Sequence, residues 1–245
     1  MGGPLEEQKG SGHRGRLRDR FIERGLDGFT DAEVLELLLT LGTPRTDCKK
    51  AARAALAKFE TLSGVLEASD ESLQAIHGIG PKNGFALHFV QAVAARYLAD
   101  RIKGRRYLHS SSDVRDFLLH TMRGLKKEVF TVIFLDSSHG IIDSEILAEG
   151  TINVNTIYPR ELVKAVLAHN AAALVIAHNH PSGSLEPSEQ DMELTRRLHL
   201  VCSFIQVKLL DHIIIGNGAY SFADHGVMTA VNDQCRELVS NCDPR

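Results

Sequence analysis

The spacing of apolar residues changes near residue 107, and this change constrains the fold more than any other feature of the 245-residue chain. Before that point apolar residues recur every three or four positions, which is typical of helices that pack on one another. After it, short β-branched runs alternate with segments of helical spacing. The sequence therefore predicts a small all-α domain followed by an α/β domain, with a mixed sheet flanked by helices.

Charge and composition indicate where the two domains are joined. The charge is +3 up to Tyr107 and −6 from Leu108 onward, and the net charge is −3. Residues 101–113, between the halves, are first basic and then polar. We therefore expect five segments: a loose tail over 1–20, a helical domain over 21–100, a basic and polar linker over 101–112, the α/β domain over 113–228 and a C-terminal tail over 229–245.

Local signals place the individual elements. Thr30 and Glu33 have the spacing of a capping box in front of an apolar helix. Further helices are expected over Ala51–Phe59, Leu62–Glu67, from Ser69, over Pro81–Leu98, from Pro159 and over Ser188–Cys202. Strands are expected over Val129–Leu135, Ile141–Leu147, Ala171–Ala177, Val207–Ile215 and Ala219–Phe222.

The turn before the helix at Pro81 has two glycines around one apolar residue, Gly78-Ile79-Gly80, followed by Lys82. It resembles the helix-hairpin-helix motif, in which backbone amides hold one DNA phosphate, and Lys82 would add positive charge. The same pattern fits a tight turn with only a structural or protein-docking role. A charge of +3 also attracts DNA weakly, so both interpretations stay open here.

The pattern with the most chemical content follows the apolar run that ends at Ala177. His178 and His180 are two apart, so in an extended chain both imidazoles project to the same side. Asp191, in the first turn of the next predicted helix, can return to this point as a third ligand. Three ligands with one open position are typical of a catalytic zinc site. A capping box of Ser188 and Asp191 would explain these two residues without a metal.

The order of these residues resembles the JAMM, or MPN-plus, metalloprotease motif, which has a distant Glu, then His-x-His-Pro-x-Gly, then Ser-x-x-Asp. Further segments extend a resemblance to the bacterial RadC family over nearly the whole chain: Gly150-Thr151, Pro159-Arg160-Glu161 and Leu210-Asp211-His212. The resemblance implies a JAMM/MPN-like fold with cytidine-deaminase-like layering. It also implies one zinc ion per chain, bound by His178, His180 and Asp191.

The same resemblance implies two catalytic roles. Ser188 would support the oxyanion of a tetrahedral intermediate. Glu128 matches the family's Glu because it immediately precedes the predicted strand Val129–Leu135, and it would act as general base. Glu145 and Glu149, on or after the next strand, are the alternatives for that role.

Asp211 and His212 lie in an apolar strand. We expect them to support the site or to be satisfied within the core, because a fourth protein ligand would occupy the open position.

Three functions follow from these patterns. The first is a zinc-dependent hydrolase of peptidase or isopeptidase type, acting on an unknown protein or peptide, with the helical domain recruiting a partner. The second is a metal-dependent nuclease to which the helical domain presents DNA. The third is a non-catalytic scaffold in DNA repair or recombination. The acidic second half disfavours the nuclease, so the hydrolase is expected first.

Other features bear on the location of the protein. No apolar run approaches the roughly 20 residues of a membrane helix, and residues 1–12 lack the pattern of a secretory signal. The four cysteines are widely spaced, as is typical of reduced thiols without a chemical role: Cys48, Cys202, Cys235 and Cys242. We therefore expect a cytoplasmic protein without membrane association.

Overall fold

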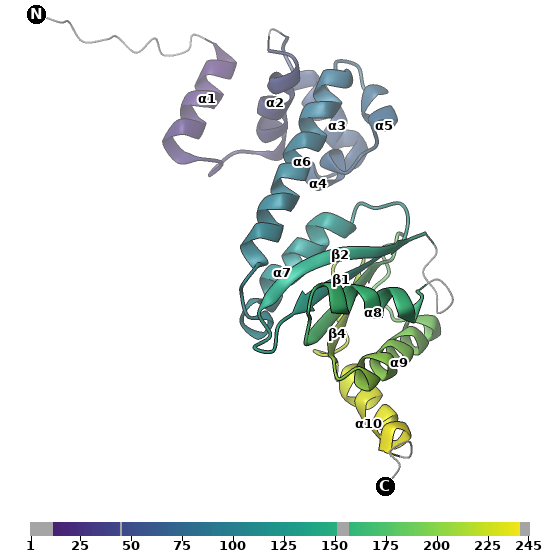
Figure 1. The fold of residues 1–245 in the computed structure, drawn as a ribbon. Helices are drawn as coiled ribbons and strands as arrows, with labels where there is room; N and C mark the ends of the chain where they lie inside the picture. Colours follow the sequence, from purple (N-terminus) through teal and green to yellow (C-terminus); the bar gives the residue numbers. More distant parts are fainter. Residues whose placement is uncertain (1–11, 45, 151–156, 241–245) are drawn as a thin grey trace, which may run out of the picture. The chain divides into compact units, whose positions relative to one another are not determined.

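The computed structural model describes residues 12–44, 46–150 and 157–240, and the chain divides into two units between Ala94 and Ala95. Figure 1 shows an all-helical first unit and a second unit built on a sheet. The expected fold class, a mixed sheet flanked by helices and preceded by an all-α region, is confirmed. The two units are described separately below.

The first unit consists of short helices around a small core. Its helices are α1 (His13–Arg24), α2 (Asp31–Gly42), α3 (Lys49–Phe59), α4 (Leu62–Leu66), α5 (Asp70–Gln74) and the start of α6 (Pro81–Ile102). The capping box expected at Thr30 and Glu33 is present at the start of α2. Leu35, Leu39, Leu73 and Leu87 are fully buried around the alanine face of α3, so small and large residues interlock in this core.

The second unit contains a five-stranded mixed sheet with the strand order β2-β1-β3-β4-β5. The strands are β1 (Val129–Leu135), β2 (Ile141–Glu149), β3 (Ala173–Asn179), β4 (Lys208–Ile215) and β5 (Ala219–Ser221). Only the pairing of β3 with β4 is parallel. In the strand order, β3 is the middle strand of the sheet. It begins and ends two residues later than the sequence predicts.

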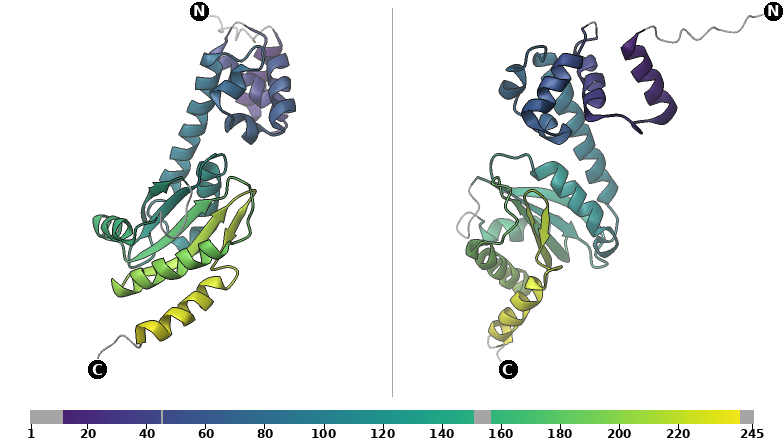
Figure 2. Two further views of the ribbon diagram at one scale, coloured as in Figure 1. Left: turned by 90° about the vertical axis from the view of Figure 1, so that its right-hand side faces the viewer. Right: turned by 180° about the vertical axis from the view of Figure 1, so that it is seen from behind.

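Helices cover both faces of this sheet, as the views in Figure 2 show. The face carrying Phe130, Val132 and Phe134 packs against α8 (Pro159–Ala168) and α9 (Glu189–Phe204). The opposite face packs against α7 (Tyr107–Met122). Because both faces are covered, β1 and β3 are buried along their whole length, which explains their continuous apolar runs.

Three segments are more helical than the expected domain boundaries imply. Residues 13–20, expected as part of a loose tail, lie in α1. Most of the expected linker is helix, because α6 continues to Ile102 and α7 starts at Tyr107, and both of these side chains are buried. The positive φ of Gly104, 73°, lies in the short break between them.

Helix α10 (Val227–Ser240) covers most of the expected C-terminal tail. It packs against α9, with Met228, Val231 and Cys235 buried. Among the described residues, no helix combines the length and apolar character that crossing a bilayer requires.

Candidate metal centre

The end of β3 carries the first two residues of the site. His178 pairs with Phe130 of β1 and, by alternation along the strand, shares the sheet face of Ile176 and Leu174, which is covered by α8 and α9. His180 lies just beyond β3, where its backbone N–H donates to the carbonyl of Ile215 at 2.7 Å. The exposed fraction of His178 is 1%, so its imidazole sits inside the protein.

The start of α9 supplies the third residue. Ser188 and Asp191 form a reciprocal capping box, in which the Asp191 N–H donates to Ser188 Oγ at 3.1 Å. The Ser188 N–H and hydroxyl donate to Asp191 Oδ2 at 2.8 and 2.7 Å. The expected capping box is therefore confirmed, and it leaves Asp191 Oδ1 directed at His178. Asp191 thus both takes part in the capping box and faces the histidines.

The three side chains converge on one point. His178 Nε2 lies 2.9 Å from His180 Nε2 and 3.0 Å from Asp191 Oδ1, and His180 Nε2 lies 3.5 Å from Asp191 Oδ2. The candidate ligand atoms are all within 4.8 Å of one another. Two imidazole nitrogens and a carboxylate oxygen at this spacing can hold a metal ion.

Buried hydrogen bonds behind His178 orient its ring. His212 Nε2 lies 2.7 Å from His178 Nδ1, and His212 Nδ1 lies 2.7 Å from Thr195 Oγ1. The Thr195 hydroxyl donates to the carbonyl of Asp191 at 2.5 Å, so it accepts from His212. His212 Nε2 must then accept from His178 Nδ1–H. The Nε2 atom of His178 therefore faces Asp191 with either a lone pair for a metal or a second proton.

The charges of the group fit a bound cation. Burial alone would raise the pKa of Asp191, but its hydrogen bonds with His178 and His180 outweigh burial and lower it far below the usual range. The hydrogen bond with Asp191 raises the pKa of His180. Burial lowers the pKa of His212 well below its ordinary value, which keeps this ring neutral behind His178. An ionised carboxylate thus faces two imidazoles, as a metal site requires.

Glu128 immediately precedes β1. By the alternation of side chains, it shares the sheet face of Phe130 and His178, and its charge contributes to the raised pKa of His180. Asn179, between the two histidines, reaches the backbone on both sides of Glu128. Its Oδ1 accepts from the Val129 N–H at 2.7 Å, and its Nδ2 donates to the Lys127 carbonyl at 3.1 Å.

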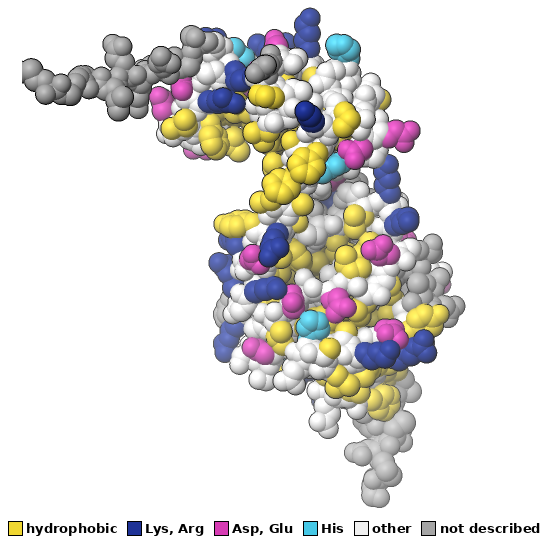
Figure 3. Space-filling model, turned by 45° about the horizontal axis from the view of Figure 1, so that its top comes forward, with side chains coloured by type: hydrophobic (Ala, Val, Ile, Leu, Met, Phe, Trp, Pro, Cys, Tyr) yellow, Lys and Arg dark blue, Asp and Glu magenta, His cyan; other side chains and the backbone are white. Residues whose placement is uncertain are grey.

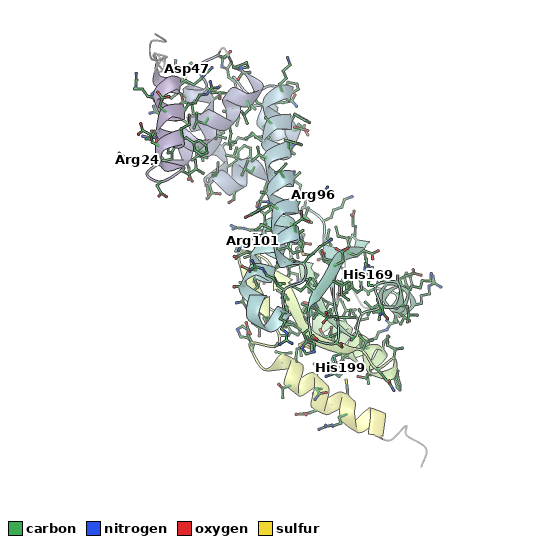
Figure 4. All side chains as sticks on the ribbon, turned by 60° about the vertical axis from the view of Figure 1, so that its left-hand side comes forward. Arg24, Asp47, Arg96, Arg101, His169 and His199 are labelled. Carbon is green, nitrogen blue, oxygen red and sulfur yellow. The ribbon has the colours of Figure 1, made fainter. Side chains whose placement is uncertain are left out.

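The two alternative carboxylates lie elsewhere on β2. Glu145 pairs in register with Val132, and its Oε2 lies 3.2 Å from Nε2 of His169, which is labelled in Figure 4. Glu149 pairs with Val129, so it belongs to the opposite sheet face from His178. Of the three candidate bases, Glu128 is therefore the one whose charge acts on the His178, His180 and Asp191 group.

Comparison with known proteins agrees with this arrangement. Residues 108–227 match the family model of the RadC-like JAB domain, and residues 11–84 match that of the UPF0758 N-terminal domain. A UPF0758 protein of Ralstonia nicotianae is 41% identical over 214 residues, which cover 87% of this chain and 96% of the relative. A UPF0758 protein of Pseudomonas fluorescens is 41% identical over 86% of this chain and 95% of its own length. The chain belongs to the RadC family, also named UPF0758.

Membership in the RadC family assigns each sequence pattern to a domain. The candidate metal-binding group lies within the RadC-like JAB domain, and the glycine turn lies within the UPF0758 N-terminal domain. The family resemblance expected from the sequence is thereby confirmed. Thr195 and Asn179 were not expected in the site. Thr195 follows Asp191 by one helical turn, and Asn179 separates the two histidines. This spacing from the candidate ligands is the sequence feature that could have predicted their place in the site.

Asp211 and His212 point to opposite sheet faces and have different partners. His212 contacts His178, as described above. Asp211 instead accepts from the hydroxyls of Tyr107 at 3.0 Å and Ser221 at 2.6 Å, and from the Ala223 N–H at 2.9 Å. Burial raises the pKa of Asp211 despite these hydrogen bonds. Asp211 thus ties α7 to β4 and β5 and lies outside the candidate metal-binding group.

The glycine turn of the UPF0758 N-terminal domain is tightly packed. Gly78 has a φ of 93°, and the buried Ile79 packs into the core of the first unit. The Gly80 N–H donates to Asn83 Oδ1 at 3.0 Å, and Asn83 Nδ2 donates to the Leu39 carbonyl at 2.8 Å. A phosphate at the Gly80 amide would have to displace Asn83. Lys82, the residue expected to add charge, is exposed.

The surface of this first unit also shows apolar side chains. Phe85 and Phe89 of α6 stack on each other with ring centroids 5.8 Å apart, and both are mostly exposed. Hydrophobic side chains are visible on this unit in Figure 3, and basic and acidic side chains are interspersed on the visible face of the second unit. The face seen there is thus of mixed charge, unlike the continuous basic surface typical of nucleic-acid binding.

Proposed function

We propose that this protein is a zinc-dependent hydrolase of peptide or isopeptide bonds. The observation that carries the proposal is the convergence of His178, His180 and Asp191, with Glu128 on the same face of the sheet. The three candidate ligands are of the types that catalytic zinc sites use. Structural zinc sites usually include cysteine, but Cys202, the cysteine of α9, is buried in the hydrophobic core and is not part of the group. Zinc bound there would act as a Lewis acid and make a nearby water more acidic.

The side chains around this point can then move a proton. The Glu128 carboxylate takes a proton from the attacking water and passes it to the leaving amine nitrogen. The Ser188 hydroxyl can stabilise the oxyanion only by turning away from Asp191 Oδ2, which retains its second donor, the Ser188 backbone N–H. The first unit would recruit the protein or peptide that is cleaved.

Two other functions are outcomes of the same test. A metal-dependent nuclease would use this ligand group on a phosphodiester, and a scaffold in DNA repair would need no reaction at all. The Gly80 amide, which the nuclease and scaffold hypotheses assign to a DNA phosphate, is satisfied by Asn83. This hydrogen bond supports placing the hydrolase first.

The first experiment measures the zinc content of the full chain by elemental mass spectrometry. The test variant is the double substitution His178→Ala with His180→Ala. The control is the double substitution His169→Ala with His199→Ala, which removes two histidines of the same unit, both labelled in Figure 4, that lie outside the group. We expect about one zinc per chain in the wild type and the control, and none in the test variant.

The second experiment tests the reaction. Peptide, isopeptide and DNA substrates are offered to the zinc-loaded wild type and to Glu128→Gln, which keeps all three ligands. We expect peptide or isopeptide cleavage that Glu128→Gln lowers by at least about 100-fold. Cleavage of DNA alone would establish the nuclease instead. A wild-type chain that takes up no zinc, or a Glu128→Gln variant of full activity, would overturn the proposal.

A further inference from the structure

Asn179, the last residue of β3, stands between the candidate ligands His178 and His180, but its side chain points to the other face of the sheet. Its exposed fraction is 1%, and its hydrogen bonds all go to the backbone of one segment. Oδ1 accepts from the Val129 N–H at 2.7 Å, and Nδ2 donates to the carbonyls of Lys127 at 3.1 Å and Leu125 at 3.3 Å. A buried amide thus binds the turn that leads into β1.

These side-chain hydrogen bonds extend the pairing of β1 with β3 beyond the last backbone pair. The register of β1 with β3 ends at the pair Phe130 and His178, so the backbone ladder does not extend to Val129. From there the side chain of Asn179 takes the place of the β3 backbone. Only a side chain with both a donor and an acceptor can bind an N–H and two carbonyls, which is the property of an amide.

The segment held in this way carries Glu128. The backbone is bound on both sides of Glu128 by Asn179, and the carbonyl of Glu128 itself accepts from the Gly150 N–H at 2.8 Å. His178 and His180 are the immediate neighbours of Asn179 in the chain, His178 within β3 and His180 just beyond its end. Through Asn179, the position of the Glu128 backbone is therefore tied to the end of β3, where both candidate ligands lie.

We propose that Asn179 is a positioning residue that fixes Glu128 relative to His178 and His180. The inference rests on the proposed function, in which Glu128 is the general base. A shift of a reacting group by about 1 Å can cost about 100-fold in rate, so the hydrogen bonds of Asn179 have a direct consequence for proton transfer.

The experiment compares Asn179→Ala with Val175→Ala in the full chain. Val175 lies on the same face of β3, is fully buried, and has no hydrogen bond to residues 125–129, so its variant controls for lost packing. In the zinc-free protein, we expect the Val129 amide to exchange with solvent at least about tenfold faster in Asn179→Ala and to be unchanged in Val175→Ala. Zinc affinity, measured by competition with a chelator, should stay within about threefold in both.

In the zinc-loaded protein, Asn179→Ala should lower kcat by about 100-fold with little change in KM. In a Glu128→Gln background, the same substitution should cause no further loss, because the group being positioned is already gone. A loss caused only by structural damage would multiply with that of Glu128→Gln. Asn179→Ser, which keeps a shorter polar group, is the second variant if the alanine variant does not fold.

The outcomes separate this inference from the proposed function. If the wild type cleaves nothing, or if Glu128→Gln is fully active, the proposed function fails and the role of Asn179 fails with it. If Glu128→Gln is inactive but Asn179→Ala has the kcat of Val175→Ala, only the role of Asn179 is overturned. Unchanged exchange of the Val129 amide in Asn179→Ala would also overturn it.

Discussion

Asp191 is used twice, once as the capping partner of Ser188 and once as a candidate ligand. Its Oδ2 accepts from the backbone and hydroxyl of Ser188, while its Oδ1 faces His178. A second capping box, formed by Thr30 and Glu33, lies in the first unit, and among the described residues no candidate metal-binding group lies beside it. The same local motif therefore begins a helix in the first unit, and in the second unit it begins a helix and also orients a candidate ligand.

The two boxes give a matched pair of substitutions. Ser188→Ala and Thr30→Ala should each lower the free energy of unfolding by about 0.5–2 kcal/mol, because each removes a cap. Only Ser188→Ala should also weaken zinc binding, by about 10–100-fold, because it removes one of the two Ser188 donors that orient the carboxylate of Asp191. Urea unfolding and chelator competition measure the two effects, and equal zinc affinity in both variants would contradict this account.

Glu33 gives a prediction about pH. Hydrogen bonds from the Thr30 backbone and from Arg20 lower the pKa of Glu33 to about 2. A carboxyl group with a lowered pKa stabilises the fold above its ordinary pKa of 4.5 and loses that contribution as the pH falls toward 2. The stability of the first unit should therefore fall over this range. Glu33→Gln should flatten that part of the profile, as thermal unfolding at several pH values would show.

At the scale of elements, the loop from β3 to α9 depends on one glycine. Gly183 has a φ of 81°, and a Cβ there would lie 2.7 Å from Nδ2 of Asn217. Gly104 has a similar φ of 73°, with no atom within 4 Å of an added Cβ. The two positions therefore share the backbone constraint and differ in their surroundings.

Replacing each glycine with alanine separates these costs. Gly104→Ala should lower the free energy of unfolding by about 1 kcal/mol, from the backbone alone. Gly183→Ala should cost more and should weaken zinc binding, since the loop between His180 and Asp191 must shift away from Asn217. Chemical denaturation with and without zinc tests this, and equal losses in the two variants would rule out a role for the contact.

How far the sequence predicts these elements depends on the range of the interaction. The candidate ligands His178, His180 and Asp191 follow from local rules, namely alternation along a strand and a capping box. Asn179 bonds to residues 50 or more positions away, and such pairings are invisible in a single sequence. From the sequence alone, the serine-rich start of α7 is interpreted as a loop, because β3 and β4, the strands that α7 contacts, lie 50 or more positions further along the chain.

At the scale of the whole molecule, the chain has separate cores in its two units. The core of the first unit contains Leu39, and the second unit has one core on each face of its sheet, with Ile133 on the α7 side. Each of these residues is fully buried. Stability should therefore be divided between the units rather than shared across the chain.

Calorimetry of two core variants tests this division. Leu39→Ala and Ile133→Ala should each cost about 2–5 kcal/mol in their own unit. We expect each variant to lower one thermal transition and leave the other unchanged. Added zinc should raise only the transition that Ile133→Ala lowers. A single transition shifted by both substitutions would show that the units unfold together.

The central position of β3 has a consequence for the order of folding. His178 lies in a strand that must first pair with β1 and β4, whose residues come from distant parts of the chain, and Asp191 joins it only when α9 docks. Such long-range pairings form late and slowly. An ion bound by this group would therefore stabilise only the fully folded sheet. It would leave the rate of refolding unchanged and slow the rate of unfolding.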